Sequence, residues 1–367
     1  MDLKSILKKG EALLKAAHNK SASSDARMLL SYVLNCSKTF LFTHYDYQLT
    51  ADEEARFVKL AELRAKGVPL QYITGQQEFM SLQFIVNPHV LIPRQETEIL
   101  VETIIDYIKN IKSRKEKSKN VKSRCIMAKS ENTGCKIRNI DCEVRNTDCK
   151  ARNEKCIERN TDCSERSTGS TGCKDCIEGM ESIESINYKN TSDNISTSIL
   201  EIGTGSGCIA VSLAFYIQNC FITAVDISEE AIETAKLNAS VNGVDNKINF
   251  IVSDLFENVG NNKFDIIVSN PPYISRKEIE HLEIEVKHHE PITALDGGLD
   301  GLDFYRAIIR EAPAYLKGEG ILAFEIGYNQ AKDVTCLMEK YFSNVRIIKD
   351  LDKNDRVVIG GIGIERI

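Results

Sequence analysis

The chain has 367 residues, of which 42% are hydrophobic, and a net charge of -6. This length suggests about two domains, and the apolar content is sufficient for buried cores. The negative charge argues against non-specific binding to nucleic acid. No apolar run approaches the roughly 20 residues that span a bilayer, and the first residues lack the apolar core of a signal peptide. We therefore expect a cytoplasmic protein.

Residues 1–75 are predicted to form a small helical bundle. Leucine and isoleucine recur at three- and four-residue spacing between Leu3 and Leu14, which is the apolar period of a helix. Thr50 and Glu53 have the spacing of a capping box that opens a further helix. This region contains no catalytic constellation of its own, so we interpret it as a substrate-recognition domain.

Residues 76–108 are predicted to contain a hairpin linker and the first helix of a second domain. Apolar side chains alternate with polar ones from Phe79 to Val86, as expected for a β-hairpin. Pro93 then blocks further strand pairing, and the acidic residues after it suit the N-terminus of a helix. We expect that helix to run to about residue 108.

Residues 109–195 differ in composition from the rest of the chain. They hold eight of the twelve cysteines, five of which open a seven-residue repeat. With cysteine at position a of a heptad, position d is always arginine, so no apolar coiled-coil seam forms. A spacing of seven without histidine does not suit zinc. We predict a disordered low-complexity insertion, and metal or redox binding is the alternative. The first third is basic, and we interpret it as a solvated linker, with a weak contact to RNA or the ribosome as the alternative.

Residues 196–367 alternate between apolar β-branched runs and helical patterns. Strands are predicted at 199–202, 222–225, 248–252, 265–269, 321–326, 345–348 and 357–359, and helices at about 208–218, 228–242, 304–316 and 329–342. This alternation predicts an α/β fold with a doubly wound, Rossmann-like sheet of seven strands. Ligands of such sheets bind outside the carboxyl ends of the strands.

A glycine-rich stretch at 201–207 lies where the first of these strands turns into a helix. Its residues are Glu201, Ile202, Gly203, Thr204, Gly205, Ser206 and Gly207. The glycines let the backbone approach a ligand closely. Their spacing differs from the G-x-G-x-x-G fingerprint of dinucleotide-binding folds. The acid at 201 would repel a pyrophosphate but can bind an ammonium group, directly or through water.

Two further acids follow the next two predicted strands. Asp226 can accept hydrogen bonds from both hydroxyls of a ribose, and Asp254 can accept from the amine of an adenine, with Leu255 and Phe256 as apolar walls. An ammonium partner, a ribose acid and an adenine acceptor together describe S-adenosylmethionine (SAM). We therefore predict SAM as the cofactor, bound by the residues from Glu201 to Gly207, Asp226, Asp254, Leu255 and also Asn270, and no metal.

Asn270-Pro271-Pro272-Tyr273 directly follows the fourth predicted strand. Two consecutive prolines fix φ and donate no backbone hydrogen bonds, so nearby carbonyls are free to accept. This corner suits a planar NH2 group: the Asn270 side-chain oxygen and the Pro271 carbonyl accept its hydrogens, and the Tyr273 ring covers its face. The pattern predicts methyl transfer to an amide or an exocyclic amine. Such transfer needs no general base, so His288 and His289 are interpreted as surface residues.

These motifs, taken together, resemble the peptide-chain release factor glutamine methyltransferases. The matching segments are 67–75, I-P-R-Q-E-T-E at 92–98, 201–207, Asp254, 270–273, 290–291, G-L-D-F-Y-R at 301–306 and 324–330. The resemblance covers about 1–108 and 196–367. The chain departs from the family at Gln95, where proline is usual, at Leu255, where an aromatic residue is sometimes found, and in its long insertion.

The resemblance implies transfer of a methyl group from SAM to the glutamine side-chain nitrogen of the Gly-Gly-Gln loop in class I release factors, in support of translation termination. It also implies that Arg94 and Glu96 contact this substrate together with Asn270 and its neighbours. We expect a monomer that binds release factors rather than nucleic acid or a membrane.

Three alternatives stay open at this point. A ribosomal-protein glutamine methyltransferase is the nearest, and the acids around Thr97 favour the release-factor branch. An N6-adenine nucleic-acid methyltransferase would use the same Asn-Pro-Pro-Tyr corner, but the net charge of -6 argues against it. A SAM-binding scaffold without catalysis is opposed by the intact Asn270 and glycine loop.

Overall fold

The computed structural model describes residues 1–130 and 196–363. One compact unit comprises Met1–Lys112 and Ile195–Ile367. The larger part of the predicted insertion, including the cysteine repeat at 135–166, lies outside the described residues. No helix in the described residues is long and apolar enough to cross a membrane.

The N-terminal residues form the predicted helical bundle. Its helices are α1 Leu3–Ala16, α2 Ala22–Leu34, α3 Lys38–Thr43, α4 Ala51–Ala65 and α5 Leu70–Thr74. The capping box before α4 is confirmed, because Thr50 Oγ1 accepts from the Glu53 amide and the Glu53 carboxylate accepts from the Thr50 amide. Arg64 Nε donates to Asp25 Oδ2 at 2.7 Å inside the bundle. The bundle therefore has its own core and its own buried ion pair.

The hairpin and the helix after it follow the bundle. Strands β1 Gln76–Phe79 and β2 Leu82–Ile85 pair antiparallel, as predicted. Helix α6 runs from Gln95 to Ser130. The prediction of disorder for 109–130 was therefore wrong. No glycine or proline interrupts this stretch, and its many lysines and arginines are good helix formers, so local propensity continues the helix.

All seven predicted strands are present and form a single sheet. They are β3 Thr197–Ile202, β4 Cys220–Asp226, β5 Ile248–Val252, β6 Phe264–Ser269, β7 Leu316–Glu325, β8 Ser343–Lys349 and β9 Asp355–Gly361. Their order is β5-β4-β3-β6-β7-β9-β8. The strands β5, β4, β3, β6 and β7 pair parallel to one another, and β9 pairs antiparallel with both β7 and β8. The doubly wound, Rossmann-like fold is confirmed.

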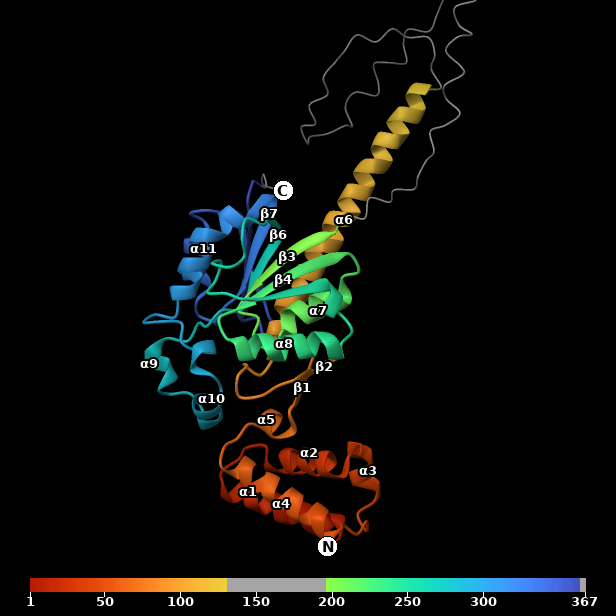
Figure 1. Cartoon of the computed structure of the whole chain (residues 1–367), viewed down its shortest axis with the longest axis vertical. Helices are drawn as coiled ribbons and strands as arrows, with labels where there is room; N and C mark the ends of the chain where they lie inside the picture. The colour runs from red at the N-terminus through yellow and green to blue at the C-terminus, as the bar shows by residue number, and fades with distance from the viewer. Residues whose placement is uncertain (131–195, 364–367) are drawn as a thin grey trace, which may run out of the picture. The chain divides into compact units, whose positions relative to one another are not determined.

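Helices cover both faces of this sheet (Figure 1). The four longer ones after the first strand are α7 Cys208–Tyr216, α8 Glu229–Val241, α11 Asp303–Tyr315 and α12 Ala331–Met338. Successive strand residues point to opposite faces: Ile199 belongs to the core under α6, α7 and α8, and Leu200 to the core under α11 and α12. The short elements η2 Asp245–Lys247, α9 Arg276–Ile279, α10 Ile284–His289 and η3 Ile292–Ala294 were not predicted. They are too brief to show an apolar period.

The sheet order creates a switch point between β3 and β6. The chain moves outward from β3 through β4 to β5, then returns to the other side of β3 as β6. The carboxyl ends of β3 and β6 stay tied, since Ser269 Oγ donates to the Ile202 carbonyl at 2.7 Å. Loops leaving these two strands diverge from this point, and a crevice there is the usual ligand site of open α/β sheets.

Candidate active site

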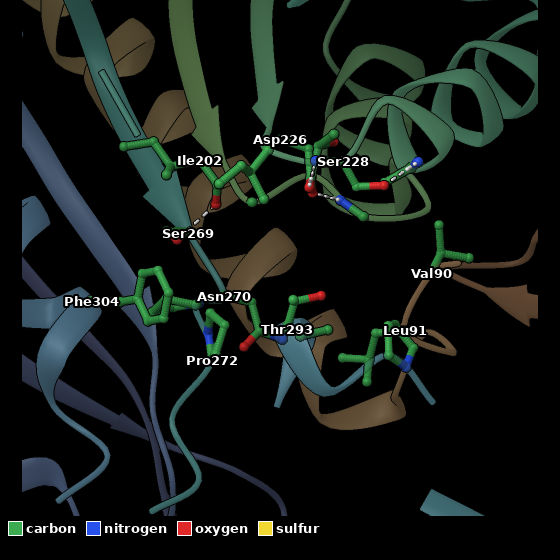
Figure 2. A pocket seen from close by; sticks show the side chains of 18 of the residues that line it. Val90, Leu91, Ile202, Asp226, Ser228, Ser269, Asn270, Pro272, Thr293 and Phe304 are labelled. Carbon is green, nitrogen blue, oxygen red and sulfur yellow. Dashed lines mark hydrogen bonds between the residues drawn. The ribbon is translucent and has the colours of Figure 1, made fainter. Parts of the chain in front are cut away.

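A cavity of about 540 Å³ lies at the carboxyl ends of β3, β4, β5 and β6. Its walls come from the segments 89–97, 202–209, 225–231, 253–255, 269–276 and 291–308. Figure 2 shows Asp226 and Ser228 on one side of it, Asn270, Pro272 and Phe304 on the other, and Val90, Leu91 and Thr293 along the edge. Its volume suits a small organic ligand.

The glycine loop forms one wall of this cavity. Gly203 and Gly205 have φ of +74° and +53°, and a Cβ atom added to either would meet nothing within 4 Å. These two glycines therefore leave space on the cavity side that a side chain would fill. Gly207 serves a different purpose, because its Cβ would lie 3.0 Å from the Cβ of Ala235 on α8. The loop thus has open space on the cavity side and is tightly packed against α8 on the other side.

Asp226 lies at the end of β4, where the sequence places it, and lines the cavity. Its Oδ2 accepts from the Gly205 amide at 2.8 Å and its Oδ1 from the Ser228 amide at 3.0 Å. Burial raises the pKa of Asp226, while these backbone hydrogen bonds lower it. A carboxylate has about four acceptor positions, so these backbone amides leave some of them to hydroxyl groups of a ligand. Asp226 both braces the loop and presents charge to the cavity.

Glu201 lies behind the loop rather than on the cavity wall. It is fully buried, and its Oε2 accepts from Thr204 Oγ1 at 2.6 Å and from the Ala210 amide at 3.1 Å. Its Oε1 has no hydrogen-bond partner in the described part of the chain. Burial raises the pKa of Glu201 to about 8. In this geometry Glu201 holds the turn into α7, and direct contact with an ammonium group stays a prediction.

Asp254 and Leu255 both line the cavity just after β5, as the sequence indicated. Leu255 has φ of +45°, in the left-handed region, which costs roughly 1–2 kcal/mol for a residue with a side chain. Ser253 Oγ donates to the Leu255 carbonyl at 3.1 Å and supports this turn. The strained turn brings the leucine side chain to the cavity.

The four residues of the Asn-Pro-Pro-Tyr corner divide into two groups. Asn270, Pro271 and Pro272 line the cavity. Tyr273 is not among the lining residues; it packs against the core under α11, and its carbonyl accepts from Gln330 Nε2 at 2.9 Å. Burial raises the pKa of Tyr273 to about 12. The tyrosine supports the corner from behind here, and its role as a cover for the acceptor stays a prediction.

An aromatic ring that the sequence did not assign lies near this corner. Phe304, the fourth residue of G-L-D-F-Y-R, lines the cavity and faces Pro272 in Figure 2. His288 and His289 do not belong to the cavity walls among the described residues; His288 is exposed and His289 half-buried. The motif itself marked position 304, but nothing in it distinguished the phenylalanine from the neighbouring tyrosine.

Arg94 and Glu96, the two predicted substrate contacts near α6, have different positions. Arg94 lines the cavity and forms an ion pair with the buried carboxylate of Glu290. Glu96 is exposed and lies outside the cavity walls. Thr97, which the sequence left without a role, is only 2% exposed and lines the cavity. Arg94 directly precedes α6, and its carbonyl accepts from the Thr97 amide at 3.1 Å, so the first turn of the helix brings Thr97 rather than Glu96 to the cavity beside Arg94.

Comparison with known proteins matches both parts of this architecture. The model of the PrmC N-terminal domain matches residues 5–75, and that of the methyltransferase small domain matches residues 186–287. A methyltransferase crystal structure from Pyrococcus furiosus is 23% identical, covers 46% of this chain and 76% of that chain, and has a TM-score of 0.35.

Two curated relatives cover nearly the whole chain. A bifunctional methyltransferase of Rickettsia felis is 35% identical over 97% of this chain, which spans 57% of the length of that relative. A release factor glutamine methyltransferase of Clostridium acetobutylicum is 31% identical over 98% of both proteins. Since the second relationship extends over the full length of both chains, this chain belongs to the release factor glutamine methyltransferase family.

Proposed function

We propose that this chain transfers a methyl group from SAM to the side-chain amide nitrogen of the glutamine in the Gly-Gly-Gln loop of class I release factors. The observation that carries the proposal is that the glycine loop and Asn270-Pro271-Pro272 line one cavity. A methyl donor and an amide acceptor could thus meet there without a long-range movement. Family membership supports the choice of substrate.

The residues on the donor side of the cavity fit SAM. The space beside Gly203 and Gly205 admits a ligand against the loop backbone, where Thr204 and Ser206 complete the turn. Asp226 has acceptor positions left for ribose hydroxyls, and Asp254 and Leu255 line the region proposed for adenine. When bound, SAM supplies a methyl group activated by a sulfonium, and this chemistry needs no metal.

The acceptor side of the cavity orients the amide. An amide nitrogen is a poor nucleophile because its lone pair is delocalised. Asn270 Oδ1 and the Pro271 carbonyl would accept its two hydrogens and aim the lone pair at the methyl carbon, while Pro272, Arg94 and Glu96 contact the surrounding substrate. Holding two reacting groups in line can lower a barrier by about 7–11 kcal/mol in favourable cases, so positioning alone is a sufficient catalytic contribution.

The remaining parts of the proposal concern the whole protein. The bundle at 1–75 recognises the release factor, and the domain at 196–367, with 76–108, performs transfer. We propose a cytoplasmic monomer that takes neither nucleic acid nor a membrane as its partner. The net charge of -6 supports this choice of partner.

The test is methylation of a purified class I release factor with SAM, mapped by peptide mass spectrometry. We expect one methyl group on the Gly-Gly-Gln glutamine, and none on a release factor whose glutamine is replaced by alanine. Parallel reactions with ribosomal proteins and with DNA or RNA test the alternatives. Methylation of either of these, with an unmodified release factor, would overturn the proposal.

A further inference from the structure

Asn270 has a hydrogen-bonded neighbourhood that the proposed reaction does not yet use. Its Nδ2 donates to Thr97 Oγ1 at 3.2 Å. Thr97 is the third residue of α6 and lies 173 positions away in the sequence. Both residues line the same cavity. The N-terminus of α6 therefore contacts the side chain on which the acceptor corner depends.

A second buried group completes this neighbourhood. Glu325 is the last residue of β7, and the β6–β7 register pairs Ser269 with Phe324. One step further along both parallel strands, Asn270 and Glu325 lie side by side. Glu325 is 2% exposed, and its Oε2 has no hydrogen-bond partner among the described residues. Burial raises its pKa to about 7, against smaller effects of the nearby Thr97 and Asn270 side chains that lower it.

When Glu325 is ionised, the chemistry of these three groups favours one arrangement of the amide. An ionised carboxylate only accepts hydrogen bonds, and a threonine hydroxyl has a single hydrogen to donate. Thr97 Oγ1 accepts from Asn270 Nδ2, which leaves the hydroxyl hydrogen of Thr97 to point at Glu325, and the NH2 group of Asn270 then faces both residues. A reversed amide would place its oxygen against a carboxylate. The amide nitrogen and oxygen of an isolated carboxamide are hard to tell apart, and here the hydrogen-bond partners assign them.

We propose that Thr97 and Glu325 are positioning residues that hold the Asn270 carboxamide with Nδ2 turned into the protein and Oδ1 turned into the cavity. This inference rests on the proposed function, since it assigns the origin of the acceptor oxygen. A carboxamide free to rotate would present its NH2 group to the NH2 group of the substrate for part of the time. Two donors then face each other and the substrate nitrogen loses its orientation.

The test compares Thr97→Val, which removes the hydroxyl at constant shape, with Thr97→Ser, which keeps it. We expect Thr97→Val to lower the single-turnover rate of methyl transfer about 10- to 100-fold, as loss of a buried hydrogen bond at a reacting group implies. Thr97→Ser should stay within about 3-fold of wild type. SAM affinity should change less than about 3-fold in both, since neither alters the donor side.

A matched control is Thr335→Val on α12, whose buried hydroxyl has no partner among the described residues and lies outside the cavity walls. It should transfer at the wild-type rate, and thermal melting of all three variants shows whether they fold. Wild-type transfer by Thr97→Val would overturn the proposal. So would a Thr97→Ser variant as slow as Thr97→Val, because packing and not the hydroxyl would then be responsible. Activity of the wild-type protein separates these outcomes from failure of the proposed function.

The second test uses Glu325→Gln and pH. The groups that act on Glu325 are Arg356 on β9, Glu96 on α6, Cys208 on α7, and Tyr273 and Tyr305. Protonation of Glu325 turns an acceptor into a donor facing the Asn270 amide. The single-turnover rate of the wild type should therefore rise with pH through about 7, and Glu325→Gln should be slow and lack this rise. Equal pH profiles in the two proteins would contradict the positioning role.

Discussion

The two halves of the cavity are constructed in different ways. The donor half consists of short stretches that each follow one strand: the loop at 201–207, Asp226 with Ser228, and 253–255. In the acceptor half, Asn270 and Thr97 line the cavity and Glu325 is buried next to them. The three residues come from distant parts of the chain. Local hydrogen bonds between backbone and side chain shape the first half. Sheet register and the start of α6 assemble the second.

This difference predicts that substitutions in the two halves affect different measured quantities. Changes in the donor half should alter SAM affinity or stability, because we propose that this half binds SAM. Changes in the acceptor half should alter the rate of transfer at saturating SAM, because we propose that this half orients the substrate amide. Variants that mix the two effects would show that the halves are coupled.

Asn270→Ala should have the largest effect. It removes the side-chain acceptor proposed to orient the substrate amide, and loss of one such group lowers turnover about 10²- to 10³-fold in comparable sites. SAM binding, measured by calorimetry, should survive at least weakly. Unchanged turnover would remove Asn270 from the mechanism, whereas complete loss of SAM binding would place it in the donor half.

Glu201→Gln tests the buried acid behind the donor loop. Its pKa in the folded protein is about 8, above the ordinary value of 4.5, so the folded state retains a proton that the unfolded state releases. The stability contributed by Glu201 is complete below pH 4.5 and falls as pH rises toward 8. Between pH 5 and pH 8 the variant should gain about 3 kcal/mol on the wild type. Glu325 also titrates in this direction, but it is present in both proteins.

The measurement is the difference in denaturation midpoint between variant and wild type at each pH, without SAM. A difference that stays constant from pH 5 to pH 8 would mean that Glu201 ionises normally in the folded protein. The loop hydrogen bonds to Thr204 and Ala210 would then be those of a carboxylate.

Asp226→Asn should weaken SAM binding about 10- to 100-fold, because hydrogen bonds to a charged group contribute about 1.5–3 kcal/mol. The rate at saturating SAM should change much less. Titration calorimetry measures the affinity, and single-turnover transfer measures the rate. A large fall in the saturated rate with normal affinity would contradict the division between the two halves.

Asp254→Asn should have the smallest effect, about 3-fold on SAM affinity, since Asp254 is exposed and its proposed partner is a neutral amine. An effect as large as that of Asp226→Asn would show that the adenine end of the ligand is held as firmly as the ribose. The same calorimetric titration checks this order.

Strand positions and the donor half were predictable because they depend on local patterns. Apolar β-branched runs marked the strands, and alternating glycines with an acid at the next strand end marked the loop. The α6 boundary was missed because composition suggested disorder while helix propensity continued the helix to Ser130. Tyr273 and Glu96 were assigned from their motifs, and neither lines the cavity.

The sequence by itself determined the order of strands and helices, the family resemblance and the residues that follow each strand. Residues that directly follow a strand lie at its carboxyl end whatever the position of that strand in the sheet. Only the tertiary structure decided which of those residues meet. Thr97 and Glu325 are 228 positions apart on α6 and β7, and no local pattern links them. They converge on Asn270 for two reasons. Parallel pairing places β7 beside β6, and α6 begins next to the carboxyl end of β6, where Thr97 contacts Asn270.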